Sequence, residues 1–404
     1  MTKAVAVVLA GLSALAALLV GSPLRFAGPV AAVGIVSGLG AALIAAVIAL
    51  RLRVPGPEMA RAGAVALALA AVACAAICGI GLVRPYSTES FRLVTAPDVS
   101  IAGQILVPEG KGPFPAVVIV PGSDGSRPVT RDSQFGLYRA NADLFARRGV
   151  VAAIYDSRGS GQSTGDRSTI LLEDRARDAA AVARWLADQP GVDASRTGFW
   201  GISNGGWVAP LAARLLRSPT FLILVSAPAT SEGLQRQYEW AAQLDARGVA
   251  ASDIQELLQT RWQIWSYLAT GEHYDDARSA YDAATQRTWW RHLDAVIHPR
   301  WLNRSYVEDS SSHDDLAWFR EDMRRDPVGV LEQVSARTLA IYGADDAVIP
   351  VAEAIERMRR AADAFRMPME VRVCERCGHP LLELGIPPRF PRWYADAMIG
   401  LIES

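Results

Sequence analysis

The sequence predicts an α/β protein: a mostly parallel sheet flanked by helices, interrupted by a helical cap insertion and preceded by three transmembrane helices. Three observations predict this arrangement. From residue 91 onward, short β-rich runs alternate with helical runs, which is typical of a parallel sheet covered by helices. The alternation stops between about residues 231 and 334, and residues 1–83 are almost free of charge. We therefore divide the chain into a membrane anchor, residues 1–83, and a soluble domain, residues 84–404, with its cap at about 231–334.

The charge of the chain is unevenly distributed between these parts. Half of the 404 residues are apolar and the net charge is only -1. Residues 1–83 hold five basic and one acidic residue, a net of +4, which leaves 36 basic and 41 acidic residues, a net of -5, in the rest. A domain with an acidic excess lacks the basic field that nucleic acids require, so no nucleic-acid partner is expected.

Three apolar runs in the first 83 residues predict the membrane spans, at about residues 4–20, 26–50 and 62–83. A helix rises about 1.5 Å per residue, so the third run reaches roughly 33 Å, enough to cross the hydrocarbon core. The first run is the shortest, and a cleaved signal peptide is the alternative for it. The lipid bilayer is thus an expected partner.

Basic residues beside the runs predict the orientation. Four lie on one side of the membrane and two on the other: Lys3, Arg51, Arg53 and Arg61 against Arg25 and Arg84. Because basic residues favour the cytoplasmic side, the amino terminus is expected inside. Three spans, or two after cleavage of the first, then leave the soluble domain on the extracytoplasmic side of the cell membrane.

The soluble domain opens with a predicted hairpin, and strands and helices then alternate. Expected strands are residues 91–96, 100–108, 116–120, 150–155, 197–200, 221–225, 338–342 and 370–373; expected helices are a segment ending at Phe145 and residues 171–188, 207–216, 351–365 and 391–402. The cap insertion falls late in this order, so we expect it to cover the carboxyl ends of the strands, where open α/β sheets place their sites.

Ser203 is the candidate nucleophile. It is the centre of a GxSxG pattern, Gly201 to Gly205, which follows an apolar strand and precedes a helix. A sharp strand-to-helix turn exposes the serine Oγ, and only small flanking residues avoid clashes there. The alternative is a structural role, in which the Ser203 hydroxyl caps the following helix in a glycine-rich turn.

His379 is the candidate base. The chain has five histidines, and four of them lie in the cap: His273, His292, His298 and His313. In this kind of site the acid and then the histidine follow the serine along the chain. Only His379 lies after the last predicted strands.

The acid is expected at the end of the preceding strand, in residues 343–350, where Asp345 and Asp346 are both candidates. A carboxylate there would fix the imidazole tautomer and stabilise the imidazolium. The oxyanion hole needs two backbone N–H groups, expected from Asn204, next to the nucleophile, and from Ser123, after the strand that ends at Val120.

Taken together, these motifs resemble the α/β hydrolase superfamily, and most of all the bacterial serine esterases related to the dienelactone hydrolase and prolyl oligopeptidase group. The resemblance covers the chain from about residue 91 to its end. It rests on five motifs in the family's order: residues 120–123, 156–163, 201–206, 343–350 and 378–379. The family's spacing implies that Asp346 is the acid and Asp345 a turn residue. It also implies that Asp156 and Arg158 are structural.

Cys374 and Cys377 form a CxxC beside His379. One CxxC with a single histidine provides too few ligands for a structural zinc. A local disulfide is the open alternative if this domain lies in an oxidising compartment.

Most of the tryptophans lie in the cap. Seven of the eleven do: Trp240, Trp262, Trp265, Trp289, Trp290, Trp301 and Trp318. They either line an apolar acyl pocket, or they form the core of the cap and a belt near the lipid.

The sequence therefore predicts a membrane-anchored serine hydrolase that cleaves carboxylic esters or thioesters through an acyl-enzyme. Its substrate would be a small-molecule acyl ester, and neither a metal nor an organic cofactor is needed. A serine peptidase or an acyltransferase of the same fold are the enzymatic alternatives. A catalytically silent membrane receptor or scaffold is the alternative of another class, and the sequence leaves the oligomeric state open.

Overall fold

A computed structural model describes residues 85–123, 136–167, 170–216, 221–294, 297–308, 316–383 and 389–404. The eight strands are β1 (Tyr86–Ala96), β2 (Val99–Pro108), β3 (Phe114–Val120), β4 (Val151–Tyr155), β5 (Val192–Ile202), β6 (Phe221–Val225), β7 (Arg337–Gly343) and β8 (Met369–Cys374). The helices around the sheet are α4 (Leu137–Arg147), α5 (Leu172–Ala187), α6 (Gly205–Arg214), α13 (Val351–Phe365) and α14 (Arg392–Glu403).

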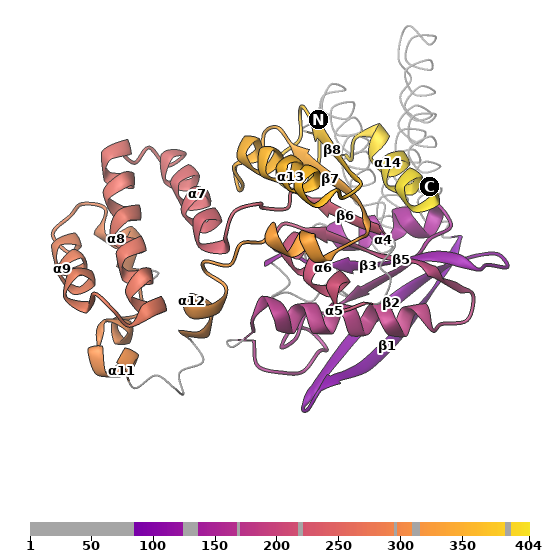
Figure 1. Ribbon diagram of the computed structural model, residues 1–404, viewed down its shortest axis with the longest axis horizontal. Helices are drawn as coiled ribbons and strands as arrows, with labels where there is room; N and C mark the ends of the chain where they lie inside the picture. Colours follow the sequence, from indigo (N-terminus) through magenta and orange to yellow (C-terminus); the bar gives the residue numbers. More distant parts are fainter. Residues whose placement is uncertain are drawn as a thin grey trace, which may run out of the picture.

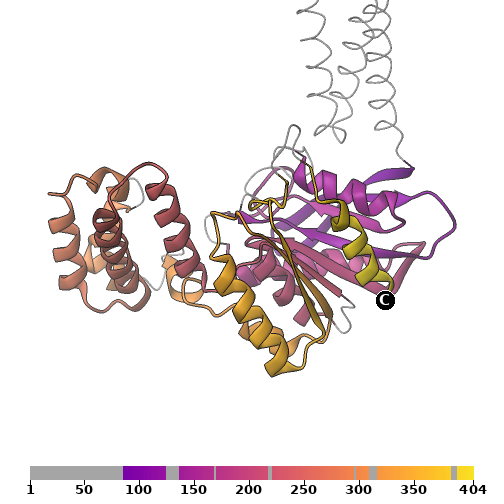
Figure 2. The ribbon, with the colours of Figure 1, turned by 90° about the horizontal axis from the view of Figure 1, so that it is seen from above.

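All eight strands form one sheet in the order β1-β2-β4-β3-β5-β6-β7-β8. The β1–β2 and β2–β4 pairs are antiparallel, and every pair from β4 to β8 is parallel. Helices lie on both faces of this sheet, as Figure 1 and Figure 2 show. The predicted α/β architecture is confirmed, and the parallel strands point their carboxyl ends at one edge.

Burial on both faces explains why the central strands are continuous apolar runs. Successive side chains of a strand point to opposite faces. Val118 of β3 and Phe199 of β5 therefore pack beneath α5, α6 and α13, whereas Ile119 and Trp200 pack beneath α4 and α14. Each face thus has its own apolar core.

A buried hydrogen-bond chain ties the last helix to the centre of the sheet. The indole N–H of Trp200 donates to the Tyr394 hydroxyl at 3.0 Å, and this hydroxyl donates to Asn141 Oδ1 at 3.0 Å. Burial raises the pKa of Tyr394 above its ordinary value, so the hydroxyl keeps its proton. The chain of bonds links β5, α14 and α4 through three buried side chains.

The residues that follow β4 make hydrogen bonds that hold their loop in place. Asp156 is fully buried and its Oδ2 accepts from the Gln162 N–H at 2.9 Å, while a Cβ on Gly161 would lie only 2.1 Å from the same oxygen. Arg158 reaches α5, where it donates to Asp178 at 2.9 and 3.0 Å. These bonds close the loop onto α5.

The cap is a helical insertion with a core of its own. It comprises α7 (Glu232–Asp245), α8 (Ala251–Thr270), α9 (Tyr274–Ala284), α10 (Trp290–Asp294), α11 (Arg304–Glu308) and α12 (Ala317–Glu321). These helices lie to one side of the sheet and are joined to it by two chain segments (Figure 2).

Aromatic side chains hold the cap together. Trp265 packs edge-on against Trp318 and Phe319, at centroid distances of 5.3 and 6.1 Å. The Arg261 guanidinium stacks on Trp240 and Trp265 at 4.1 and 3.9 Å, and burial, with Arg236 nearby, lowers the pKa of Arg261 to about 9. Of the two roles expected for the tryptophans, these contacts favour the core of the cap.

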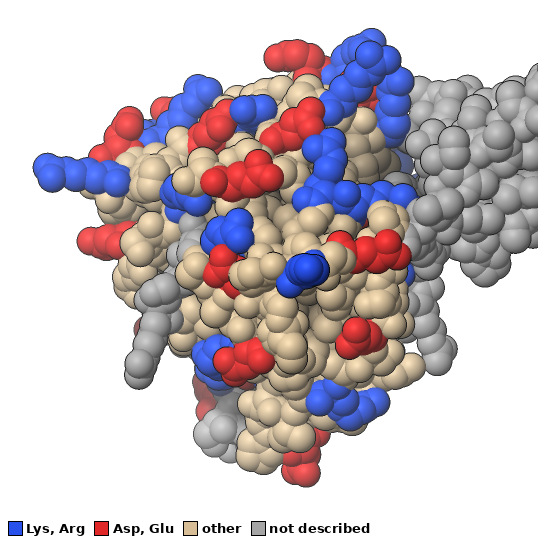
Figure 3. All heavy atoms as spheres, turned by 90° about the vertical axis from the view of Figure 1, so that its right-hand side faces the viewer, with Lys and Arg blue, Asp and Glu red and all other residues tan. Residues whose placement is uncertain are grey.

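The three expected membrane spans, at residues 4–20, 26–50 and 62–83, lie outside the described residues. In the portion of the chain from residue 85 onward that the structure does describe, no helix combines the length and apolar character needed to span a bilayer. On the face drawn in Figure 3, acidic and basic side chains are mixed among uncharged ones.

Loss of the Arg158 guanidinium should destabilise the domain. Arg158→Met would leave Asp178, whose side chain is 2% exposed, without its cation. Uncompensated burial of one partner of such a pair costs about 3 kcal/mol. Urea unfolding should show this loss, whereas Arg177→Met, which removes a pair whose arginine is 58% exposed, should change the free energy of unfolding by less than about 1 kcal/mol. Equal unfolding midpoints for the two variants would contradict the structural role.

Candidate active site

Ser203 lies on the turn between β5 and α6 in a left-handed conformation, with φ of +54°. A non-glycine residue in this region costs about 1–3 kcal/mol, so the surrounding structure must hold it there. The Ser203 N–H donates to the Val225 carbonyl at 3.0 Å, and the Ser203 carbonyl accepts from the Gly206 N–H at 2.7 Å. The backbone of the candidate nucleophile is thus fixed on both sides.

Two flanking glycines make this turn sterically feasible. A Cβ on Gly201 would lie 2.3 Å from the Gly205 carbonyl oxygen, and a Cβ on Gly205 would lie 2.4 Å from the Val120 carbonyl oxygen. Neither contact can be relieved by rotating a side chain, because both involve backbone atoms. The GxSxG spacing is therefore a packing requirement of the turn.

Asp346 and His379 are brought together by the loops after β7 and β8. Asp346 Oδ2 lies 2.8 Å from His379 Nδ1. Its Oδ1 accepts from the N–H groups of Val348 and Ile349 at 2.8 and 3.2 Å. The carboxylate is buried and oriented by backbone donors, whereas Asp345 is exposed. Of the two acids left open by the sequence, Asp346 contacts the histidine.

His379 and Ser203 are anchored to adjoining residues at the carboxyl end of β6. Val225 accepts from the Ser203 N–H, and the hydroxyl of the next residue, Ser226, donates to the His379 carbonyl at 2.9 Å. Within the described part of the chain, Ser203 Oγ makes no hydrogen bond to His379. Catalytic hydrogen bonds are often long before substrate binds and shorten in the complex.

Cys374 and Cys377 form a disulfide between the end of β8 and the His379 loop. The Cys377 carbonyl accepts from the Asp345 N–H at 3.0 Å, and a Cβ on Gly343 would lie 2.3 Å from the same oxygen. Both cysteines are buried. The histidine loop is therefore packed directly on the loop that holds the acid.

The loop expected to form half of the oxyanion hole is fixed by two side chains. The Gly122 N–H donates to the Tyr138 hydroxyl at 3.0 Å. Arg175 of α5 donates to the carbonyls of Pro121 and Gly122 at 2.6 and 3.1 Å. Sequence reasoning missed Arg175, because no motif distinguishes it from the other arginines of α5.

The turn residue Asn204 is the other expected oxyanion donor. Among the described residues its backbone N–H has no acceptor, and its side-chain oxygen accepts from Arg175. The structure thus places Ser203 and Asn204 on one turn and Asp346 beside His379. The chemical roles of these residues, and that of Ser123, stay predictions.

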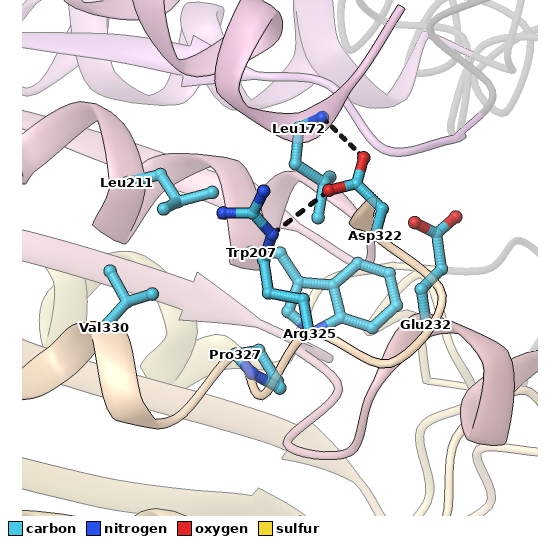
Figure 4. A pocket seen from close by; sticks show the side chains of 8 residues that line it. All are labelled: Leu172, Trp207, Leu211, Glu232, Asp322, Arg325, Pro327 and Val330. Atoms are coloured by element: carbon cyan, nitrogen blue, oxygen red, sulfur yellow. Dashed lines mark hydrogen bonds and ion pairs between the residues drawn. The ribbon is translucent and has the colours of Figure 1, made fainter. Parts of the chain in front are cut away.

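Beside α6, the end of the cap meets the start of α5 around a cavity of about 10 Å³. Figure 4 shows Asp322 between the Leu172 N–H and the Arg325 guanidinium, above the indole of Trp207. Asp322 accepts from these two groups at 2.9 and 3.1 Å, and Arg325 also reaches Glu173 at 3.0 Å. This cluster joins the cap to the sheet domain.

Burial raises the pKa of Asp322 to about 6, and the nearby charge of Glu232 acts in the same direction. The Leu172 N–H and the Arg325 guanidinium oppose this shift without cancelling it. The cap junction therefore contains a carboxyl group whose pKa is raised toward neutral pH.

Comparison with known proteins identifies the family. The model of the X-Pro dipeptidyl-peptidase (S15) family matches residues 98–359. The chain belongs to this family. This assignment supports the expected α/β hydrolase superfamily, and the expected esterase subgroup stays a prediction.

Two curated relatives of this S15 family member match shorter segments. A polyketide transferase of Penicillium crustosum is 33% identical over 143 residues, covering 34% of this chain and 43% of the relative. A thiohydrolase of Aspergillus aculeatus is 27% identical over 131 residues, covering 32% of this chain and 38% of the relative. The matches thus span less than half of either relative.

Among solved structures, an esterase of Pyrococcus furiosus is similar to this S15 family member. The two chains are 15% identical with a TM-score of 0.49, and the similarity covers 79% of this chain and 91% of the esterase.

Replacement of Asp322 by asparagine should remove a loss of folding stability that grows as the pH rises. Because the folded-state pKa of about 6 lies above the ordinary value, the folded state holds this proton more tightly than the unfolded state does. The contribution of Asp322 to stability is therefore largest below about pH 4 and falls as the pH rises to about 6. An asparagine at this position cannot ionise, so the stability of Asp322→Asn relative to wild type should improve by about 2 kcal/mol between these limits.

Urea unfolding at pH 4.5 and pH 7 measures this difference. Asp326→Asn, at a carboxylate that is 58% exposed, is the matched control and should show no comparable trend. If the free energy of unfolding of wild type rose relative to that of Asp322→Asn as the pH increased, the sign would contradict a raised pKa of Asp322.

Proposed function

We propose that this S15 family member cleaves carboxylic esters or thioesters with a triad of Ser203, His379 and Asp346. The hydrogen bond between Asp346 and His379 is the observation that carries this proposal, because the carboxylate is buried and already oriented. The left-handed turn at Ser203, between β5 and α6, supports the assignment of the nucleophile.

The hydrogen bond between Asp346 and His379 supports one direction of proton transfer. With Nδ1–H donating to Asp346, the neutral imidazole has its lone pair on Nε2, the nitrogen that accepts the Ser203 proton. Ser203 Oγ then attacks the acyl carbonyl carbon, and the imidazolium formed is stabilised by the Asp346 carboxylate.

The tetrahedral oxyanion is held by the backbone N–H groups of Asn204 and Ser123. His379 returns the proton to the leaving alcohol or thiol, and the Ser203 acyl-enzyme remains. Water, deprotonated by His379, attacks this ester and releases the acid. No metal or organic cofactor takes part in these steps.

The names of the relatives are consistent with a small-molecule acyl substrate, since one is a polyketide transferase and another a thiohydrolase. An acyltransferase would use the same acyl-enzyme with an alcohol or amine in place of water. A substrate panel distinguishes the two outcomes.

Peptide hydrolysis is the second candidate, and the family assignment favours it. A free peptide amino group would need an available carboxylate near the site. The two buried carboxylates at the cap junction, Glu232 and Asp322, are already paired with Arg236 and Arg325 at 2.6 and 3.1 Å. The names of the relatives, a polyketide transferase and a thiohydrolase, lead us to rank esters and thioesters ahead of peptides.

We also propose that residues 1–83 anchor the enzyme in the cell membrane with the hydrolase domain on the extracytoplasmic side. The apolar runs and the basic residues between them support this orientation. The Cys374–Cys377 disulfide supports it as well, because disulfides persist in oxidising compartments.

Covalent labelling with a fluorophosphonate tests the nucleophile. Wild type and Ser195→Ala, a change at an exposed serine, should label equally and hydrolyse p-nitrophenyl esters and acyl thioesters. Ser203→Ala should lose labelling and at least about 10³-fold of the turnover rate. Absence of labelling in folded wild type would favour the silent receptor or scaffold, and cleavage confined to Xaa-Pro anilides would favour the peptidase.

Protease accessibility in cells tests the location. On intact spheroplasts, added protease should degrade the domain from residue 84 onward without lysis, whereas a cytoplasmic marker should survive. A hydrolase domain that is degraded only after lysis would place it on the cytoplasmic side.

A further inference from the structure

Arg175 connects the two segments that are expected to form the oxyanion hole. From the first turns of α5, its Nη2 donates to the carbonyls of Pro121 and Gly122 at 2.6 and 3.1 Å. Its Nη1 donates to the side-chain oxygen of Asn204, the residue after the nucleophile. One guanidinium therefore ties the loop after β3 to the turn after β5.

The bond to Gly122 acts on the peptide unit that contains the Ser123 N–H. In a trans peptide the carbonyl and the N–H point in opposite directions within one plane. A donor that holds the Gly122 oxygen therefore fixes the direction of the Ser123 N–H. A hydrogen bond to the carbonyl also polarises the amide and strengthens its N–H as a donor.

Neighbouring contacts leave this peptide little freedom. The preceding peptide is held at both ends, because the Gly122 N–H donates to Tyr138 and the Pro121 carbonyl accepts from Arg175. The loop begins directly at the end of β3, whose Val120 is fully buried. The Arg175 guanidinium thus completes the set of bonds that orients the loop.

The charge of Arg175 is not cancelled by an ion pair in the described part of the chain. Arg158 and Arg177, which lie close to it in the fold or on the same helix, pair with Asp178 and Asp174 at 2.9 and 2.6 Å. The recorded partners of Arg175 are instead two carbonyls and an amide oxygen. A positive charge held behind the oxyanion donors stabilises negative charge that develops in front of them.

We propose that Arg175 is a positioning residue for the oxyanion hole, which it aligns and polarises without touching the substrate. This inference rests on the proposed serine hydrolase function. It predicts that the Arg175 contacts stabilise the tetrahedral transition state more than the bound ester, so their loss lowers kcat and leaves KM nearly unchanged.

Three variants test the inference in the full-length protein. Arg175→Met keeps much of the side-chain volume and removes the charge and the donors. Arg175→Lys keeps the charge but cannot bond both carbonyls and Asn204 at once. Arg177→Met removes an exposed arginine two residues along α5 and is the matched control.

Arg175→Met should lower kcat for a p-nitrophenyl ester by about 10²-fold, comparable to loss of an oxyanion donor, with KM within about twofold of wild type. The affinity for a trifluoromethyl ketone, which forms a tetrahedral oxyanion on the serine, should fall by a similar factor. Arg175→Lys should recover part of both losses, and Arg177→Met should match wild type. Thermal unfolding shows whether each variant is folded.

Unchanged kcat and ketone affinity in folded Arg175→Met would overturn the inference, and so would a rise in KM with kcat unchanged. If Arg175→Met does not fold, Arg175→Lys becomes the test. A lysine variant with the kcat and the ketone affinity of wild type would exclude alignment by the guanidinium. Failure of the proposed function is distinct: wild type itself would then neither label with fluorophosphonate nor turn over esters.

Discussion

The strained turn at Ser203 is the constraint on which the rest of the site depends. A serine with φ of +54° is stable only where its neighbours fix the backbone, and here β6 and the first turn of α6 do so. The same turn needs Gly201 and Gly205, because backbone oxygens lie where their side chains would be. Gly205 packs on the end of β3, so one contact positions the Ser203 turn relative to the loop that contains Ser123.

Much of the fold could be predicted from the sequence because the parallel strands are buried on both faces. Runs such as Phe221–Val225 have no exposed face that would interrupt their apolar pattern, and the structure has a strand at these same residues. The start of β5 was missed: it begins at Val192, well before the expected residue 197, because its first five residues are half-buried or exposed and carry no such pattern. Strand boundaries were thus predicted correctly where burial was complete.

The candidate site residues were predictable where each lies in a short motif and the motifs follow a fixed order along the chain, although Ser203 and His379 are far apart in sequence. The family's spacing implied Asp346 rather than the adjacent Asp345, and in the structure Asp346 contacts His379 and the backbone donors Val348 and Ile349. Arg175 was not predictable in this way, because it donates to carbonyls that lie more than fifty residues earlier in the chain. The roles of the cap tryptophans likewise depended on helix packing, which no local pattern encodes.

Transfer of the acyl group through Ser203, with His379 as base, can be followed by mass spectrometry of protein quenched within one turnover of an activated ester. We expect an adduct with the mass of the acyl group on the peptide that contains Ser203, and no such adduct in His379→Ala on the same timescale. Acylation of another residue during ester turnover would contradict this mechanism. So would turnover in which the alcohol is released before the acid and no adduct forms.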